Sequence, residues 1–327
     1  MNFPVEIFQE FSVLSIPMKA RFRGIDYREV AIFRGSEGWS EFSPFLEYGS
    51  EEASIWLKAA LEAAYRPWPE LFRTRIKVNA TLPQVTVERV PEILQGFAGC
   101  TSVKIKVDDF EIGSELVEAT LDYLPDAKIR LDVNGGWSLD EALLHLYDYN
   151  LRFGNIFEYI EQPCHTLEEL KKLKAEIPFK IAADEAIRKE LDSPLELLHN
   201  YADIAILKWA PVGGIQSAHE LAGRIGLPVV ISSALETGIG IAQGLALAAS
   251  FPELEYACGL GTVSLLDSDI CEPFFIANDG YLDLRRAEPV SALVAKYSAA
   301  PERVEWWQRR IIEIWESESF REGRDWE

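Results

Sequence analysis

Short runs rich in β-branched residues alternate along the chain with longer segments whose apolar residues recur every three or four positions. From about residue 76 onward there are eight such runs: IKVNATL, VKIKV, KIRLDVN, FEYIEQP, FKIAADE, IAILKW, PVVISSA and YACGLGT. Intervening segments such as SLDEALLHLYDYNL and TLEELKKLKAEI have helical periodicity and begin at Ser or Thr, which are good N-caps. This alternation predicts a (β/α) barrel. A doubly wound open sheet is the alternative, disfavoured because the chain has neither GxGxxG after the first strand nor a P-loop.

The first 75 residues and the C-terminal tail follow other patterns. Three strand-like runs, FSVLSI, REVAIFRG and GWSEFSPF, precede a helical run, SEEASIWLKAALEAAY, which predicts a separate α+β unit. The tail segment PERVEWWQRRIIEIWESESF has the pattern of an amphipathic helix. We interpret Trp306, Trp307 and Trp315 in that helix as packing residues.

Charged residues end five successive predicted strands of the barrel. The reactive groups of a (β/α) barrel lie at the C-terminal ends of its strands, so these side chains are expected to face one site. Buried ionised groups cost several kcal/mol unless they are paired, so the three carboxylates among them require cations. The five residues are Lys106, Asp132, Glu161, Asp184 and Lys208.

The three carboxylates form a set of hard oxygen donors. Such a set favours Mg²⁺, with Mn²⁺ as the expected substitute, and disfavours zinc. The alternative is a buried salt-bridge network, which we disfavour because a network that only stabilises the fold has no reason to place each member at a strand end. That network would pair Asp132, Glu161 and Asp184 with Lys104, Lys106 and Lys208.

Lys104 and Lys106 lie two positions apart in SVKIKVDDF, so a strand points both side chains to the same face. Two solvated lysines on an edge strand are the alternative. Beside a divalent metal, a lysine can remove a proton next to a carboxylate while the metal stabilises the dianion. Free lysine has a pKa of about 10.4 and acts best as a base near 7 to 8. We expect Lys104, the metal and desolvation to lower the pKa of Lys106, which would be the base.

Composition and net charge limit the classes of molecule that this chain is expected to bind. The chain has 327 residues, of which 48% are hydrophobic, and a net charge of −21, which argues against nucleic acid or an anionic membrane. No basic leader and no apolar run near the roughly 20 residues of a membrane helix are present, so the expected location is cytoplasmic. The four cysteines show no CxxC spacing and are expected to be reduced, buried thiols. We expect a small-molecule dicarboxylate substrate and a monomer or small homo-oligomer.

The remaining Cys and His residues carry little chemistry. Cys164 and His165 stand beside Glu161, but we interpret the pair as packing rather than as metal ligands. His145, His199 and His219 lie in helical patterns without the spacing of a base and a nucleophile, which disfavours Ser or Cys hydrolase chemistry.

The combination of a KxK strand, Asp, Glu and Asp on the next three strands and Lys on the sixth resembles the enolase superfamily, and more closely its muconate-lactonizing subgroup. The resemblance implies a (β/α)7β barrel over residues 76–284. It also implies an α+β capping domain over residues 1–75, with residues 285–327 packing back onto it. The implied roles are catalysis for Lys104, Lys106 and Lys208 and metal binding for Asp132, Glu161 and Asp184.

Further motifs resemble the o-succinylbenzoate synthase family of that subgroup: GWSEFSP, KVNATLP, RLDVNGGW, YIEQP, LKWAPVGG, SSALETGIG and GLGT. This resemblance implies dehydration of 2-succinyl-6-hydroxy-2,4-cyclohexadiene-1-carboxylate to 2-succinylbenzoate, through an enediolate, in menaquinone or phylloquinone biosynthesis. Lys106 would remove the α-proton and protonate the departing hydroxyl on the same face, with Lys208 over the opposite face. N-succinylamino acid racemisation or dipeptide epimerisation on the same scaffold stays open. A non-catalytic scaffold barrel is the non-enzyme alternative, which the complete ligand set disfavours.

Several residues are candidates for substrate binding. Ser233 and the backbone N–H groups of Gly238, Ile239 and Gly240 would lie near the succinyl chain or its carboxylate, although a plain loop turn is the alternative. Residues 16–30, IPMKARFRGIDYREV, are basic and are expected to form a mobile lid, with a solvated hairpin as the alternative. The further candidates are Arg21, with Arg23 beside it, and Asn134. Asp267 and Asp269 could be mistaken for the ammonium-binding Asp-x-Asp of dipeptide epimerases, and their role stays open.

Overall fold

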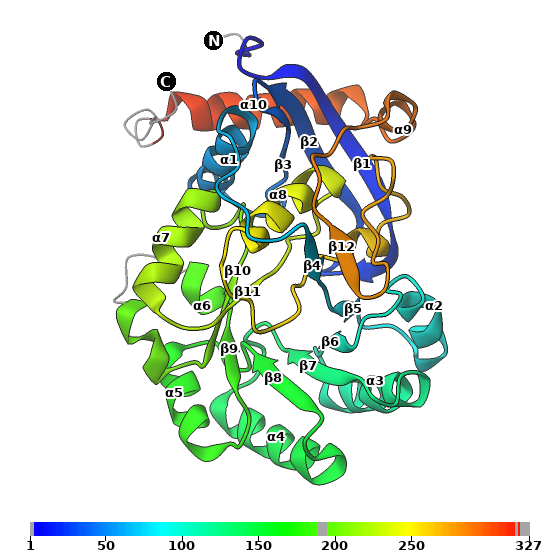
Figure 1. Ribbon diagram of the computed structural model, residues 1–327, viewed down its shortest axis with the longest axis vertical. Helices are drawn as coiled ribbons and strands as arrows, with labels where there is room; N and C mark the ends of the chain where they lie inside the picture. The colour runs from blue at the N-terminus through cyan, green and yellow to red at the C-terminus, as the bar shows by residue number, and fades with distance from the viewer. Residues whose placement is uncertain (1–2, 189–194, 318–319, 321–327) are drawn as a thin grey trace.

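The computed structural model describes residues 3–188, 195–317 and 320. Its upper part in Figure 1 is a three-stranded antiparallel sheet of β1 (Gln9–Phe22), β2 (Ile25–Gly35) and β3 (Gly38–Phe42), in that order. Helix α1 (Ser50–Tyr65) contacts β3, and α10 (Pro301–Glu316), from the far end of the sequence, contacts both α1 and β1. We call this assembly of β1, β2, β3, α1 and α10 the cap.

The C-terminal helix packs as its pattern predicts. Trp307 is fully buried and lies edge-on to Phe42 of β3, with ring centroids 5.6 Å apart. Trp315 makes a similar contact with Phe8. The interpretation of these tryptophans as packing residues is therefore confirmed.

The lower part of Figure 1 is a curved parallel sheet of seven strands, neighbouring one another in sequence order. The strands are β5 (Ala80–Leu82), β6 (Ser102–Lys106), β7 (Lys128–Asp132), β8 (Phe157–Glu161), β9 (Ile181–Ala183), β10 (Ile204–Leu207) and β11 (Val229–Ile231). The connecting helices are α2 (Val90–Leu94), α3 (Phe110–Tyr123), α4 (Leu139–Phe153), α5 (Leu167–Glu176), α6 (Glu185–Arg188), α7 (Ile215–Ile225) and α8 (Gly238–Ala249). Helix α9 (Ser291–Lys296) and the 3₁₀ segments Val87–Arg89, Leu195–Asn200 and Thr262–Leu265 complete the described helices.

Two of the expected barrel strands differ from the sequence pattern. IKVNATL divides into β4 (Arg75–Lys77), which pairs antiparallel with β12 (Tyr281–Asp283), and β5, which pairs with β6. The partner changes between them because Val78 N–H donates to Gly280 O and Asn79 N–H donates to Cys258 O. YACGLGT forms no ladder and makes single parallel bridges instead, Val78 to Cys258 and Ser232 to Gly259.

These single bridges close the sheet into a barrel, which excludes the open doubly wound alternative. A side chain on Gly259 would meet Ser232 Oγ at 2.5 Å, so a larger residue at this seam would force the Ser232 side chain to shift. The fold class expected from the sequence, a (β/α) barrel with an α+β cap, is confirmed.

Local sequence signals set the helix starts. Ser138 and Thr166 form capping boxes with Glu141 and Glu169 at the N-termini of α4 and α5, so the predicted N-caps are confirmed there. Helix α7 instead starts after Gly214, whose φ of +119° favours glycine. No helix in the described part of the chain is long and apolar enough to span a membrane.

Strand register decides which side chains share the barrel interior. Lys106 pairs with Asp132, and Asp132 pairs with Glu161, so these three residues form one layer at the carboxyl ends of β6, β7 and β8. Two residues earlier, Lys104 and Arg130 form the layer below. A second, smaller cluster of buried side chains is formed by Tyr159, Ala182, Ile204, Ile206, Val230 and Tyr256.

Candidate active site

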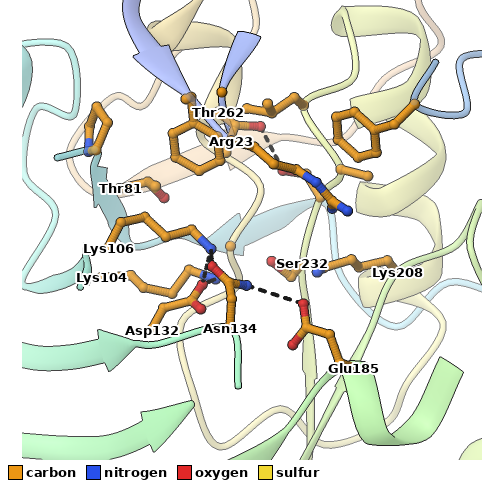
Figure 2. Close-up of a pocket in the computed structure, with 18 of the residues that line it drawn as sticks. Arg23, Thr81, Lys104, Lys106, Asp132, Asn134, Glu185, Lys208, Ser232 and Thr262 are labelled. Carbon is orange, nitrogen blue, oxygen red and sulfur yellow. Dashed lines mark hydrogen bonds and ion pairs between the residues drawn. The ribbon is translucent and has the colours of Figure 1, made fainter. Parts of the chain in front are cut away.

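A pocket of about 520 Å³ lies at the carboxyl ends of the barrel strands, beneath the cap. Figure 2 shows Lys104 and Lys106 entering it from one side and Lys208 from the other, with Asp132 and Asn134 between them. The cap supplies the rest of the wall. Its pocket-lining residues are Arg21, Phe22, Arg23, Gly24, Phe45, Tyr48 and Trp56.

The two lysines of β6 point to the same carboxylate, as their spacing predicts. Lys106 Nζ lies 2.6 Å from Asp132 Oδ2, and Lys104 Nζ lies 2.9 Å from the same oxygen. Lys104 also donates to Glu161 Oε1 at 2.9 Å. The edge-strand alternative is wrong, because β6 lies between β5 and β7 and Lys104 is buried.

The remaining strand-end charges lie on the next three strands. Glu161 ends β8, Asp184 directly follows β9, and Lys208 directly follows β10. Lys208 Nζ lies 2.5 Å from Asp184 Oδ2. Glu161 and Asp184 are buried behind the pocket wall rather than exposed in it. The expectation that all five charges gather at one end of the barrel is confirmed.

Burial and ion pairing have opposite effects on the pKa values of these groups. Burial alone would raise the pKa of Asp132, but the ammonium groups of Lys104 and Lys106 outweigh it and hold that pKa below its usual range. Burial, with the nearby charge of Asp132, raises the pKa of Glu161 to about 7. Burial works to lower the pKa values of Lys104 and Lys208, but the neighbouring carboxylates raise both.

The contacts of the three carboxylates resemble the salt-bridge network considered from the sequence. In the described residues, no three His, Cys, Asp or Glu side chains converge closely enough to hold a metal as they stand, because Lys104 and Lys208 bind these carboxylates. Asp132 is nevertheless incompletely satisfied. Its buried Oδ1 has no hydrogen-bond partner within the described structure, whereas Oδ2 contacts both lysine ammonium groups. The donor type and this unsatisfied oxygen fit a hard divalent cation.

Asn134 contacts the proposed base rather than standing alone in the pocket. Its Oδ1 accepts from Lys106 Nζ at 2.6 Å, and its Nδ2 donates to Glu185 Oε1 at 3.1 Å (Figure 2). Sequence reasoning did not select Glu185. Its position directly after Asp184 in AADEA, at the carboxyl end of a predicted barrel strand, could have indicated it. Sequence reasoning also did not select the pocket-lining hydroxyls, which only the barrel register brings together: Thr81, Ser232 and Thr262.

The residues of SSALETGIG separate into two groups. Ser233 lines the pocket, and its Oγ lies 2.6 Å from Thr262 Oγ1. Gly238, Ile239 and Gly240 form the buried first turn of α8 instead. The Gly238 N–H donates to Asp269, the Ile239 N–H to Thr237 Oγ1 and the Gly240 N–H to Glu41. Their expected role as donors to a substrate carboxylate is therefore wrong, because protein oxygens already occupy these N–H groups.

The same contacts explain the Asp-x-Asp sequence. Asp269 is buried and accepts from the N–H groups of Gly238, Ile270 and Phe275. Asp267 accepts from the Tyr297 hydroxyl at 2.9 Å. Asp269 thus accepts from the first N–H group of α8, whose N-cap is Thr237, and is not available to a substrate ammonium group.

Residues 16–30 form part of a hairpin, with the turn between β1 and β2 at Arg23 and Gly24 and an irregular pairing between Pro17 and Phe22. Both Arg21 and Arg23 line the pocket. Arg21 donates to the backbone oxygen of Gly24, whereas Arg23 stacks on Phe45 at 4.2 Å and donates to the Tyr48 hydroxyl. The hairpin alternative is confirmed as a conformation, and the mobility of the segment stays a prediction.

The four cysteines are buried free thiols, as expected. Cys164 bridges to Trp137 through the backbone, and burial raises the pKa of its thiol to about 12. Its interpretation as a packing residue agrees with this environment.

Comparisons with known proteins place the two parts of the chain in one superfamily. Residues 13–64 match the family described as enolase N-terminal domain-like, and residues 88–289 match the family described as enolase C-terminal domain-like. Among solved structures, muconate cycloisomerase from Pseudomonas fluorescens has a TM-score of 0.73 at 19% identity, covering 89% of this chain and 98% of that one. The L-Ala-D/L-Glu epimerase from Bacillus subtilis has a TM-score of 0.71 at 22% identity, covering 86% and 96%. These two structures show the fold.

Curated relatives are more similar. The o-succinylbenzoate synthase of Mycolicibacterium smegmatis is 44% identical over 313 residues, covering 94% of this chain and 95% of that protein. The o-succinylbenzoate synthase of Mycobacterium tuberculosis is 42% identical over 317 residues, covering 94% of both. The chain therefore belongs to the o-succinylbenzoate synthase family of the enolase superfamily.

Proposed function

We propose that this protein is an o-succinylbenzoate synthase. It would catalyse the Mg²⁺-assisted syn dehydration of 2-succinyl-6-hydroxy-2,4-cyclohexadiene-1-carboxylate to 2-succinylbenzoate. The observation that carries the proposal is the convergence of Lys106 and Lys208 on one pocket from opposite sides (Figure 2). Three carboxylates, Asp132, Glu161 and Asp184, lie at the ends of successive strands beside them. The identity to curated relatives of that name, over 94% of the chain, supports the same reaction.

Lys106 is the proposed general base and general acid. Its neutral amine takes the α-proton of the carboxylate-bearing carbon, and the electron pair of that C–H bond passes into the substrate carboxylate. The C–O bond to the hydroxyl group then breaks while the Lys106 ammonium returns a proton to the leaving oxygen, which departs as water. The ring gains its aromatic double bond, and Lys106 ends as the neutral amine.

Asn134 and Lys104 support this step. Asn134 Oδ1 accepts from Lys106 Nζ, which fixes the direction of the amine. Lys104 lies between Asp132 and Glu161 and adds positive charge below the substrate carboxylate. Both residues act on the base or on the carboxylates rather than on the proton itself.

Lys208 is proposed to lie over the other face of the substrate ring, where its cation favours the negative charge that develops there. A dehydratase that removes and returns protons on one face needs no acid on the opposite face. Lys208 therefore acts as a fixed charge, paired with Asp184.

Asp132, Glu161 and Asp184 would hold Mg²⁺, with Mn²⁺ as a substitute. When bound, the ion would supply a Lewis-acid charge that stabilises the enediolate form of the substrate carboxylate. The residues favour this ion over zinc because all three are carboxylates.

The substrate's second carboxylate requires a cation away from the reacting carbon. Arg21 and Arg23 line the pocket from the cap hairpin, and Ser233 lines it from the barrel. We propose that these three residues bind the succinyl side chain. Of the two arginines, Arg23 is the more firmly held, through Tyr48 and Phe45.

The deciding assay offers two sets of substrates to the purified protein with Mg²⁺. One is the cyclohexadiene, followed by the ultraviolet absorbance of the aromatic product. The other is a panel of N-succinylamino acids and dipeptides in D₂O, followed by α-deuterium incorporation. Dehydration of the diene is expected. Rapid deuterium incorporation into the panel, with no dehydration, would replace the synthase by a racemase or an epimerase.

A further inference from the structure

One wall of the pocket is a short turn that follows β11. Ser232, Ser233, Ala234 and Leu235 all line the pocket. Leu235 has a φ of +64°, in the left-handed region that disfavours residues other than glycine. Such a conformation costs of order 1 to 3 kcal/mol and persists only when its surroundings hold it. The wall therefore needs a restraint.

Arg28, a buried residue of β2 in the cap, supplies contacts to this turn. Its Nε donates to Leu235 O at 3.1 Å, and its Nη2 donates to Ala234 O at 3.2 Å. The planar guanidinium thus donates to two consecutive carbonyls of the turn from two nitrogens in fixed positions. A lysine ammonium group, with its single nitrogen, cannot reproduce this geometry. Arg28 itself does not line the pocket.

The same guanidinium also contacts the cap wall of the pocket. Its Nη2 donates to Ser43 O, and its Cζ lies 4.5 Å from the centre of the Phe45 ring. Phe45 lines the pocket from the cap, and Arg23 Cζ stacks on it at 4.2 Å from the ring centre. One buried side chain therefore links the cap wall to the barrel wall.

Two buried carboxylates complete this arrangement. Glu236 Oε2 accepts from Ala234 N–H at 2.6 Å, inside the same turn. Glu41 of β3 accepts from the N–H and the hydroxyl of Thr237, at 3.0 and 2.6 Å. The turn is thus held on both sides by ionisable groups that are buried with Arg28.

We propose that Arg28 is a positioning residue for substrate binding: it holds the Ala234–Leu235 turn and Phe45 at the separation that the substrate requires. This inference rests on the proposed function for its substrate. Removing Arg28 lets the strained Leu235 relax and the wall move. The substrate then binds more weakly, while Lys106 on β6, Asp132 on β7 and Glu161 on β8 keep their places.

The test compares Arg28→Met, which keeps length and packing on Phe45, with Arg34→Met. Arg34 is an exposed residue of the same strand that pairs with Glu10. For Arg28→Met we expect the KM for the diene to rise about tenfold or more with kcat within about threefold. Hydrogen exchange should rise in residues 232–237 and stay unchanged in β6 and β7. Arg34→Met should match the parent in both measurements.

A second substitution tests the strain itself. Glycine adopts a positive φ without steric cost, so adding Leu235→Gly to Arg28→Met should lower hydrogen exchange in residues 232–237 toward that of the parent. If Arg28→Met does not fold, Arg28→Lys takes its place. This variant keeps the positive charge but not the planar guanidinium, and it should show a smaller rise in KM, again with kcat nearly unchanged.

Several results would overturn the proposal. The first is an Arg28→Met protein whose KM and hydrogen exchange equal those of the parent. The second is a fall in kcat as large as the rise in KM, with hydrogen exchange raised throughout the barrel. The third is failure of both Arg28 variants to fold. Failure of the proposed function is seen separately, as a parent protein that does not dehydrate the diene. In that case the hydrogen exchange of residues 232–237 still decides whether Arg28 holds the turn.

Discussion

Lys106 and Lys208 enter the pocket from opposite walls, one at the end of β6 and the other directly after β10 (Figure 2). Each is paired with a different carboxylate, Lys106 with Asp132 at 2.6 Å and Lys208 with Asp184 at 2.5 Å. A flat substrate ring between them would present one face to each amine. This relationship separates the two lysines in function, and their substitution should give different results.

Replacing Lys106 by Ala should abolish turnover, with a loss of at least about 10³-fold in kcat, because the same amine removes and returns the proton. The fold should remain, as judged by circular dichroism. Lys128→Ala is the matched control, since Lys128 is exposed at the other end of the adjacent strand β7. Substantial residual activity in Lys106→Ala would identify Lys208 as the base.

Replacing Lys208 by Ala should lower kcat for the diene by about 10²-fold, because a preorganised charge near the developing anion is lost. Lys208→Arg keeps the cation and should lose less activity, although its different shape limits the recovery. Steady-state kinetics of the two variants measure this order. Equal losses in both would argue that the position of the amine, and not its charge, is what the reaction needs.

Removing divalent metal with a chelator should abolish activity, and Mg²⁺ or Mn²⁺ should restore it. Asp132→Asn should weaken Mg²⁺ binding by at least about tenfold, since it replaces a proposed ligand. Calorimetric titration with Mg²⁺ measures this without an activity assay. Asp126→Asn, an exposed control, should bind as the parent does. An active zinc-containing enzyme that does not respond to Mg²⁺ would contradict the assignment.

Glu41 should make the protein less stable as the pH rises from about 4.5 to about 7. Burial and the nearby charge of Glu236 raise its pKa from 4.5 to about 7 in the folded protein. In this range the unfolded chain loses the proton while the folded chain keeps it, so the free energy of unfolding falls. The full penalty is reached above pH 7 and has an upper limit of about 3 kcal/mol.

Glu41→Gln should therefore gain stability relative to the parent as the pH increases. Urea unfolding of both proteins at pH 5 and pH 8 measures this difference, and comparing the two proteins cancels the titration of other buried carboxylates. A difference in stability that is the same at both pH values would mean that Glu41 is ionised throughout.

Asp269→Asn should destabilise the fold by about 1 to 2 kcal/mol, because a carboxylate that accepts from the first N–H group of α8 is replaced by a weaker acceptor. The kcat and KM for the diene should stay near those of the parent, since Asp269 does not line the pocket. Thermal unfolding measures the loss of stability, and steady-state kinetics measure kcat and KM. A large increase in KM with unchanged stability would restore a substrate role for this residue.

The sequence by itself determined the barrel and the main chemistry of its site. Strand and helix patterns depend on neighbouring residues, and the rule that strands of a barrel end at one face turns the positions of Lys106, Asp132, Glu161, Asp184 and Lys208 into one site. Lys104 and Lys106 share a face because successive side chains of a strand alternate. These inferences need only local geometry and one topological rule.

Tertiary structure decided which polar groups were already occupied and which distant residues became neighbours. The N–H groups of Gly238 and Gly240 looked available in the sequence, but Asp269 and Glu41 bind them from other parts of the chain. The link from Arg28 to Leu235, 207 positions apart, was equally invisible. Hydrogen bonds between segments far apart in sequence depend on how the cap sits on the barrel, and no local pattern of residues encodes that placement.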